Sequence, residues 1–134
     1  MHQLQIIIPS ILVVGAVMVG GLFSRWQEKS EPDLDQQVLN QLKKAGSNLS
    51  KPHDIEFFLY FPTEELANQA AEEVKKEGCS VKVGLGADES AWLCFATKRM
   101  IPKHEELVRL RKRFNDIASK YQGEYDGWGT GVVE

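Results

Sequence analysis

The stretch from Asp54 to Phe61 (DIEFFLYF) constrains the fold of this chain more than any other part of its sequence. Aromatic and branched side chains dominate it, and Pro62 directly after it stops a regular strand. Because side chains alternate between the two faces of a strand, Glu56, Phe58 and Tyr60 share one face. The other face is entirely apolar and consists of Ile55, Phe57, Leu59 and Phe61. We therefore predict a strand whose apolar face is buried in the core.

Helical and strand-like patterns alternate along the rest of the chain. The predicted elements are a helix over 34–45, the strand over 54–61, a helix over 64–77, strands over 79–85 and 91–97, a helix over 102–122 and a last strand over 123–133. The two later helices carry apolar core stripes at helical spacing, which are Leu66, Ala67, Ala70, Ala71 and Val74 in the first and Leu107, Leu110, Phe114, Ile117 and Tyr121 in the second. The last six elements follow the strand–helix–strand–strand–helix–strand order of the split βαβ pattern. The predicted fold class is α+β, a ferredoxin-like βαββαβ sandwich with an extra N-terminal helix. Right-handed crossovers place the two later helices on one face of an antiparallel sheet, with the last strand at an edge beside the first.

The last predicted strand, with the sequence GEYDGWGTGVV, is unusually rich in glycine. Glycine weakens a strand, so each glycine there needs a structural reason. Strict alternation places Gly127, Gly129 and Gly131 toward the helices, where they would let a helix approach closely. Asp126 and Trp128 would then lie on the opposite face. On this interpretation Trp128→Ala weakens partner binding more than it lowers the melting temperature.

The sheet face turned away from the helices is the candidate partner-binding site. Its predicted members are Phe58, Tyr60, Trp92, Asp126 and Trp128, with Cys94 beside them, whereas Leu93 and Phe95 are assigned to the core. A contiguous group of aromatic side chains on an open sheet face is typical of an interaction site. An alternative is that the helix over 34–45 folds over this face and makes it part of the core.

Composition and residue spacing argue against several other functions. The formal net charge of −3 gives no general electrostatic case for binding nucleic acid. His2, His53 and His104 are scattered without metal-ligand spacing, and Cys79 and Cys94 are too few for a disulfide framework. We predict no catalytic residues, no metal site and no cofactor.

A basic stripe on the last helix leaves an alternative function open. The stripe consists of Arg109, Lys112, Arg113 and Lys120 and lies opposite the predicted core face of that helix. It is either a solvated helix face or a site for RNA, which could also stack on the aromatic sheet face. The strand over 91–97 lacks the basic-glycine-aromatic signature of an RNA-recognition motif, which disfavours RNA.

The N-terminal residues 6–23 are apolar and carry no charge. In a helix they would extend about 27 Å, close to the hydrocarbon thickness of a bilayer. The first basic residues, Arg25 and Lys29, follow this stretch, so the positive-inside rule places the N-terminus outside and the remainder in the cytoplasm. A cleaved export signal is the alternative. The predicted organisation is an inner-membrane anchor over 1–24, a linker over 25–32 and a folded domain over 33–134.

Three short motifs carry a resemblance to a known family. They are EYDGWGT (124–130), GSNLSKP (46–52) and FPTE (61–64), and the resemblance covers roughly residues 34 to 131. The sequence resembles the family called regulator of ribonuclease E activity B, also described as a ribonuclease E inhibitor. The resemblance implies a ferredoxin-like domain without catalysis that binds the endoribonuclease, inhibits it and alters RNA decay.

The expected function is therefore that of a membrane-anchored, non-enzymatic regulatory domain. The resemblance implies a protein partner, a ribonuclease E-type endoribonuclease. Besides RNA binding, one structural alternative remains: self-association into a homo-oligomer through the open sheet face or the last, edge strand.

Overall fold

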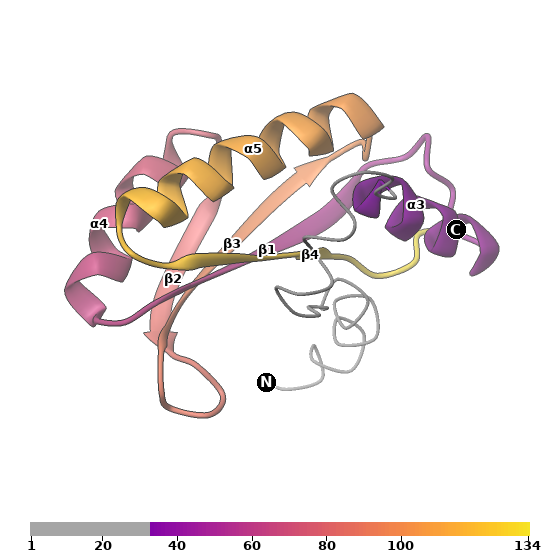
Figure 1. Cartoon of the computed structure of the whole chain (residues 1–134). Helices are drawn as coiled ribbons and strands as arrows, with labels where there is room; N and C mark the ends of the chain where they lie inside the picture. Colours follow the sequence, from indigo (N-terminus) through magenta and orange to yellow (C-terminus); the bar gives the residue numbers. More distant parts are fainter. Residues whose placement is uncertain (1–32) are drawn as a thin grey trace.

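The computed structural model describes residues 33–134, and the predicted anchor and linker lie outside them. Residues 33–134 fold into three helices and four strands (Figure 1). The elements are α3 (Leu34–Lys44), β1 (His53–Phe61), α4 (Glu64–Lys75), β2 (Ser80–Leu85), β3 (Trp92–Met100), α5 (His104–Lys120) and β4 (Glu124–Gly129). Within this part of the chain, no helix has the length and apolar character needed to cross a bilayer.

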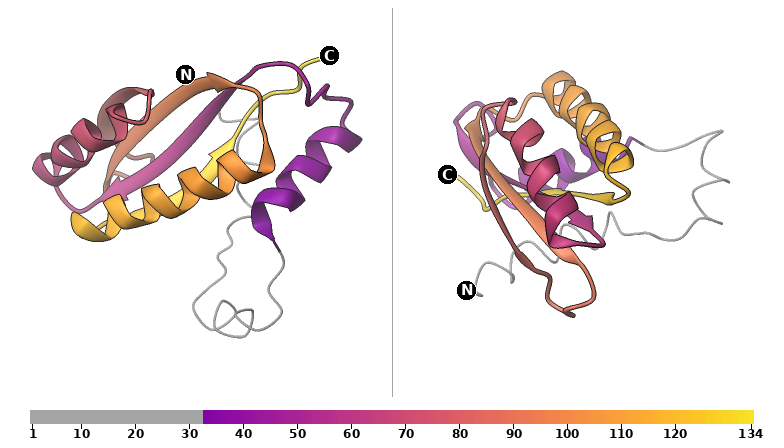
Figure 2. Two further views of the ribbon diagram at one scale, coloured as in Figure 1. Left: turned by 90° about the horizontal axis from the view of Figure 1, so that it is seen from above. Right: turned by 90° about the vertical axis from the view of Figure 1, so that its left-hand side faces the viewer.

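The four strands form one antiparallel sheet in the order β2-β3-β1-β4. The strand order confirms the predicted mixed α+β architecture, in which the first and third strands are central and β4 is an edge strand beside β1. Helices α4 and α5 lie side by side on one face of this sheet (Figures 1 and 2). The sheet therefore has one helix-covered face and one face that neither α4 nor α5 covers.

The core lies between the helices and the covered face of the sheet. Phe57 of β1 is fully buried, and its ring meets Phe114 of α5 edge-on at a centroid distance of 5.0 Å. The apolar face predicted for β1 is buried along its whole length. Further core residues come from the predicted helix stripes: Ala67, Ala70, Ala71 and Val74 of α4, and Leu107, Leu110, Phe114 and Ile117 of α5. These core residues, predicted from the strand period of β1 and the helical period of α4 and α5, are confirmed.

Helix α3 does not cover the open side of the sheet. Val38, Leu39 and Leu42 belong to the same core cluster as the covered face. The N-terminal cap residue of α3, Asp33, contacts His104 at the start of α5 through Oδ2 and Nε2 at 2.6 Å. Figure 2 shows α3 near the N-terminal end of α5. The alternative in which this helix folds over the open face was wrong.

The glycine-rich strand β4 contains a bulge that reverses one of the predicted faces. Phe57 pairs with Trp128 and Leu59 pairs with Tyr125, so two β4 residues stand opposite the single residue Phe58. Gly127 has a φ of +104°, a left-handed conformation that favours glycine. Because of the bulge, Tyr125 and Trp128 both face the helices.

The role predicted for the glycines of the last strand, close approach of a helix, is not found at Gly127 or Gly131, and Gly129 is paired with Glu56 of the open side. Gly127 serves the bulge, and a Cβ added at Gly131 would meet no atom within 4 Å. The glycine that does permit a close approach is Gly123, where an added Cβ would lie 2.2 Å from the carbonyl oxygen of Tyr60. Gly123, which immediately precedes β4, therefore lets the start of this strand pack closely against β1.

The faces predicted for β3 were also reversed. Cys94 is paired with Leu59 and Ala96 with Phe57, so both lie on the covered face and are fully buried. Directly paired residues in an antiparallel ladder share a face, which puts Phe95 on the open side with Phe58. Leu93 lies on the open side for the same reason.

Candidate protein-binding surface

An aromatic group occupies the centre of the uncovered sheet face. Phe58 of β1 and Phe95 of β3 are directly paired, with ring centroids 5.3 Å apart and planes at 60°. Tyr60 and Leu93 form the next pair along the same strands, and all four side chains are partly exposed. We define the open face as Glu56, Phe58, Tyr60, Leu93, Phe95, Glu124 and Asp126. Partly exposed aromatic side chains in this number mark a surface suited to binding.

Carboxylates border the aromatic centre. Glu56 precedes Phe58 on the same face, and Glu124 of β4 is paired with Tyr60. Partial burial, followed by the charge of Asp54, raises the pKa of Glu56 above its usual value. Partial burial, followed by the charge of Glu124, raises the pKa of Asp126 in the same way. The folded protein therefore holds negative charge on this face at a cost in free energy.

Two further observations concern the carboxylates of this face, one on the neighbouring Tyr60 and one on Glu56 itself. Burial and then the charges of Asp126 and Asp88 raise the pKa of Tyr60. The Oε1 atom of Glu56 is buried and has no hydrogen-bond partner among the described residues. A buried carboxylate oxygen without a hydrogen-bond partner raises the free energy of the folded state. This part of the open face therefore lacks a polar contact that its carboxylate could use.

The structure brings together three of the five residues predicted for the site. Phe58, Tyr60 and Asp126 lie on the open face. Trp92 is paired with Phe61, lies on the covered side and packs against the core. Trp128 is only 3% exposed and is not accessible to a partner. The site residues that sequence reasoning missed are Glu56, Leu93, Phe95 and Glu124.

Trp128 instead belongs to a buried polar cluster that joins three elements. Its Nε1 donates to Oδ1 of Asp35 in α3 at 3.0 Å, and Nε of Arg111 in α5 donates to Oδ2 of the same carboxylate at 2.7 Å. Burial opposes the charge of Arg111, but the hydrogen bond with Asp35 and the charges of Asp35 and Asp33 together outweigh it and raise the Arg111 pKa. Both carboxylate oxygens of Asp35 are thus used to position α3 against α5 and β4, and Trp128→Ala is expected to destabilise the fold.

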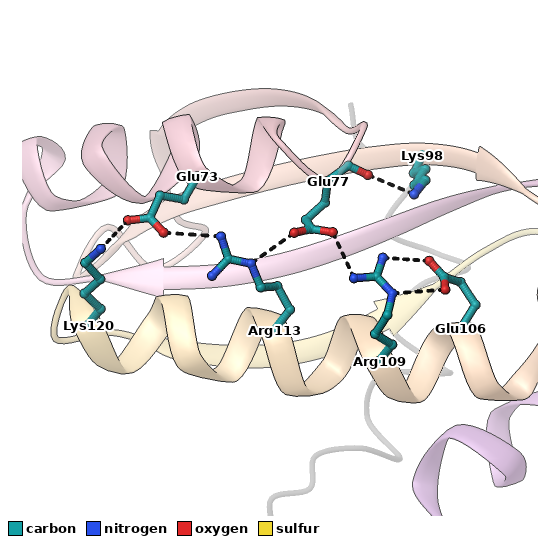
Figure 3. A network of polar contacts seen from close by, with 7 residues as sticks. All are labelled: Glu73, Glu77, Lys98, Glu106, Arg109, Arg113 and Lys120. Atoms are coloured by element: carbon teal, nitrogen blue, oxygen red, sulfur yellow. Dashed lines mark hydrogen bonds and ion pairs between the residues drawn. The ribbon is translucent and has the colours of Figure 1, made fainter.

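The basic stripe on α5 is largely neutralised by acidic side chains of α4. Arg113 Nε donates to Glu77 at 3.0 Å, and Lys120 Nζ donates to Glu73 at 2.7 Å (Figure 3). Arg109 bridges Glu77 at 3.1 Å and Glu106 at 2.8 Å. Among the described residues, three of the four stripe residues are therefore held in ion pairs, so apart from Lys112 the stripe gives little free basic surface for RNA.

The acidic partners in this network are strongly stabilised in their charged form. Hydrogen bonds from Lys120 and Tyr121 lower the pKa of Glu73 to about 2. Hydrogen bonds from Arg113 and Arg109 lower the pKa of Glu77, although its partial burial acts in the opposite direction. The helix side of the molecule thus pairs its charges, whereas Glu56, Glu124 and Asp126 on the open face form no ion pair within the described domain.

The two cysteines have the properties of core residues. Burial raises the pKa of Cys94 to about 12 and that of Cys79 to about 11. Both therefore remain protonated thiols at neutral pH, and the thiol is a poor nucleophile and metal ligand compared with the thiolate. Within residues 33–134, no group of three or more His, Cys, Asp or Glu side chains is arranged to hold a metal ion.

The fold and the open face together define a small α+β domain that carries an exposed aromatic surface suited to binding another protein. The family model described as "Regulator of ribonuclease activity B" matches residues 32–130. This match covers most of the chain and all the strands of the sheet, so the chain belongs to the regulator of ribonuclease activity B family. The resemblance carried by the three sequence motifs is thereby confirmed at the level of the family. A comparison with curated proteins found no match.

Proposed function

We propose that this protein is a non-enzymatic, membrane-anchored regulator that binds an endoribonuclease of the ribonuclease E type and slows its cleavage of RNA. The observation that carries the proposal is the family match, which extends over the described domain from before α3 to the end of β4. The family description itself names the regulation of ribonuclease activity. Regulation requires a surface for the enzyme, and the open face offers one.

The side chains that could support catalysis are occupied in structural roles. Cys94 is a buried thiol, and His53 is fully buried between Ser47 and the carbonyl oxygen of Lys51, at 2.6 and 2.8 Å. The raised pKa values of Glu56 and Asp126 follow from burial and neighbouring acids, and no base or nucleophile of the described domain is paired with either carboxyl. These features support a role in binding.

A direct assay tests the regulatory function. Purified ribonuclease of this type is mixed with the full chain in non-ionic detergent, and the cleavage of a fluorescent single-stranded RNA is followed. We expect a saturable decrease in the cleavage rate and co-purification of the two proteins. An unchanged rate at a large excess of the chain, together with no co-purification, would reject the function.

The proposed location is a single-pass membrane protein with its N-terminus outside and its domain in the cytoplasm. The support is the uncharged stretch 6–23 and the basic residues Arg25 and Lys29 that follow it. A cytoplasmic domain would share a compartment with RNA and with the proposed partner.

Introduced cysteines can test this topology, because the native Cys79 and Cys94 are buried and react slowly. Ala87→Cys, in the exposed loop between β2 and β3, is expected to resist a membrane-impermeant maleimide in spheroplasts until the membrane is permeabilised. His2→Cys is expected to react at once. Immediate labelling of the Ala87 variant would place the domain outside.

A further inference from the structure

The centre of the open face has the composition of a binding hot spot. Phe58, Tyr60 and Phe95 are partly exposed and lie on the two central strands, on the face opposite the buried residues Phe57 and Leu59. Clustered aromatic side chains surrounded by polar groups are typical of the energetic centre of a protein interface. A segment that docks here would bury apolar surface first.

The charges around this centre indicate what such a segment carries. Glu56, Glu124 and Asp126 form no ion pair within the described domain, in contrast to Glu73 and Glu77 on the helix side. Arg99 of β3 lies on the same face as Phe95, but its guanidinium is already paired with Asp54 at 3.1 Å. Lys82 of β2 is paired with Phe95 and adds one positive charge on the β2 side of this face. The three carboxylates on the β1 and β4 side outnumber it, so negative charge is in excess there and a complementary partner is basic.

The carboxyls of Glu56 and Asp126 are partly desolvated, and this further favours a cation beside them. A positive charge placed beside Glu56 or Asp126 would reverse the cost of ionising these carboxyls, including the shielded Glu56 Oε1. Arginine suits this surface better than lysine. Its planar guanidinium stacks on aromatic rings while it pairs with carboxylates, and it is less strongly hydrated.

We propose that the open face binds an arginine-containing, partly apolar segment of a partner protein, with guanidinium groups stacked on Phe58 or Tyr60 and paired with Glu56 or Asp126. Along β1, Glu56, Phe58 and Tyr60 follow one another at intervals of about 7 Å, so an extended segment with arginine at alternate positions matches the carboxylate and aromatic row. The inference deepens the proposed function and rests on it only for the identity of the partner, the ribonuclease.

The test measures the binding of short fluorescent peptides to the full chain in non-ionic detergent. The probe peptide alternates arginine and leucine, and matched peptides replace arginine by lysine or by glutamine. We expect binding that weakens from arginine to lysine to glutamine and that decreases with salt concentration. Equal affinity for the arginine and glutamine peptides would overturn the proposal.

Variants of the chain locate the peptide on the surface. Phe58→Ala is expected to weaken binding of the arginine peptide about tenfold, as truncation of a central aromatic contact does. Glu56→Gln and Asp126→Asn are each expected to weaken it about threefold, as for a single exposed ion pair. Glu65→Gln, which removes an exposed carboxylate from α4, is the matched control and should change nothing. Asp126 is exposed on an edge strand, so Asp126→Asn is expected to stay folded. Weaker peptide binding by this variant would therefore not result from misfolding.

Further outcomes separate this inference from the proposed function. If ribonuclease is captured equally by the wild type and by Phe58→Ala and Asp126→Asn, the regulatory function stands and the docking surface is overturned. If the peptide binds through the open face and ribonuclease is never captured, the docking surface stands and the proposed function fails. Sedimentation showing a dimer that the same variants dissociate would mean that a second copy occupies the face. Direct binding of a labelled RNA oligonucleotide to the chain that Phe58→Ala abolishes would assign the face to RNA, and either result overturns the inference.

Discussion

The two faces of the sheet are built from similar residue types and have opposite properties. Phe57 and Phe58 are neighbours in β1, yet the first is fully buried against Phe114 and the second is partly exposed beside Phe95. On the helix side, Glu73 and Glu77 are paired with basic side chains, whereas Glu56 and Asp126 on the open face have raised pKa values. The covered side is arranged for stability. The open face retains features that cost stability, which is common where a surface is kept for binding.

The largest expected difference between the faces is in the two adjacent phenylalanines. Phe57→Ala is expected to lower the free energy of unfolding by about 3–5 kcal/mol, because it removes a fully buried ring and leaves a cavity. Phe58→Ala, the matched neighbour, should cost about 1–2 kcal/mol, because its ring is already partly in water. Urea unfolding followed by circular dichroism measures both. Equal losses would mean that the open face is part of the core.

A second comparison uses one carboxylate from each face. Asp35→Ala is expected to cost about 2–4 kcal/mol, because it leaves the buried Trp128 indole N–H and the partly buried Arg111 without their acceptor. Asp126→Ala should leave the unfolding free energy within about 0.5 kcal/mol of the wild type or increase it. The same unfolding experiment applies. A large loss with Asp126→Ala would show that it has a stabilising role on the open face.

The glycines of the last strand and its extension test where close packing occurs. Gly123→Ala is expected to cost about 1–3 kcal/mol or more, since the new Cβ would collide with the backbone oxygen of Tyr60 and the ring of Phe61. Gly131→Ala is the control, because open space surrounds its added Cβ, and it should change stability by less than about 0.5 kcal/mol. Thermal melting distinguishes the two. Equal effects would contradict the close approach of β4 to β1 at Gly123.

The smallest expected effect is a difference in pH dependence between the two faces. The pKa of Glu73 falls from 4.5 to about 2 on folding, so its contribution to stability is present above pH 4.5 and is lost as the pH falls toward about 2. Glu56 has the opposite sign. Its folded-state pKa is raised above 4.5, so its penalty is present above that raised value and is relieved as the pH falls through it to below 4.5.

Stability measured from neutral to acidic pH tests these signs. Glu73→Gln should lower stability at pH 7 and reduce its loss in acid, whereas Glu56→Gln should raise stability at pH 7 and leave a steeper loss in acid. Urea midpoints at several pH values provide the measurement. A Glu56→Gln variant that is less stable than the wild type at pH 7 would show that the carboxylate is satisfied in the folded state.

Local patterns were sufficient to predict the order of the elements, the buried face of β1 and the core stripes of α4 and α5. These features depend on periods of two and 3.6 residues within a single element, which the sequence carries directly. The motifs near β1 and in β4 were also sufficient to predict the family. Of the open face, Phe58, Tyr60 and Asp126 were placed correctly.

Alternation also puts Glu56 with Phe58 and Glu124 with Asp126, but the positions of Leu93, Phe95 and Trp128 were decided only by tertiary structure. Strand β3 carries apolar side chains on both faces, so its own alternation does not show which face is covered, and only the pairing of Phe95 with Phe58 determines it. In β4, one residue inserted at the Gly127 bulge moved Trp128 from the open face to the core. The position of α3 depends on hydrogen bonds from Trp128 and Arg111 to Asp35, residues far apart in the chain. Sequence periodicity thus determined what each element buries, and long-range register determined which aromatic side chains remain at the surface for a partner.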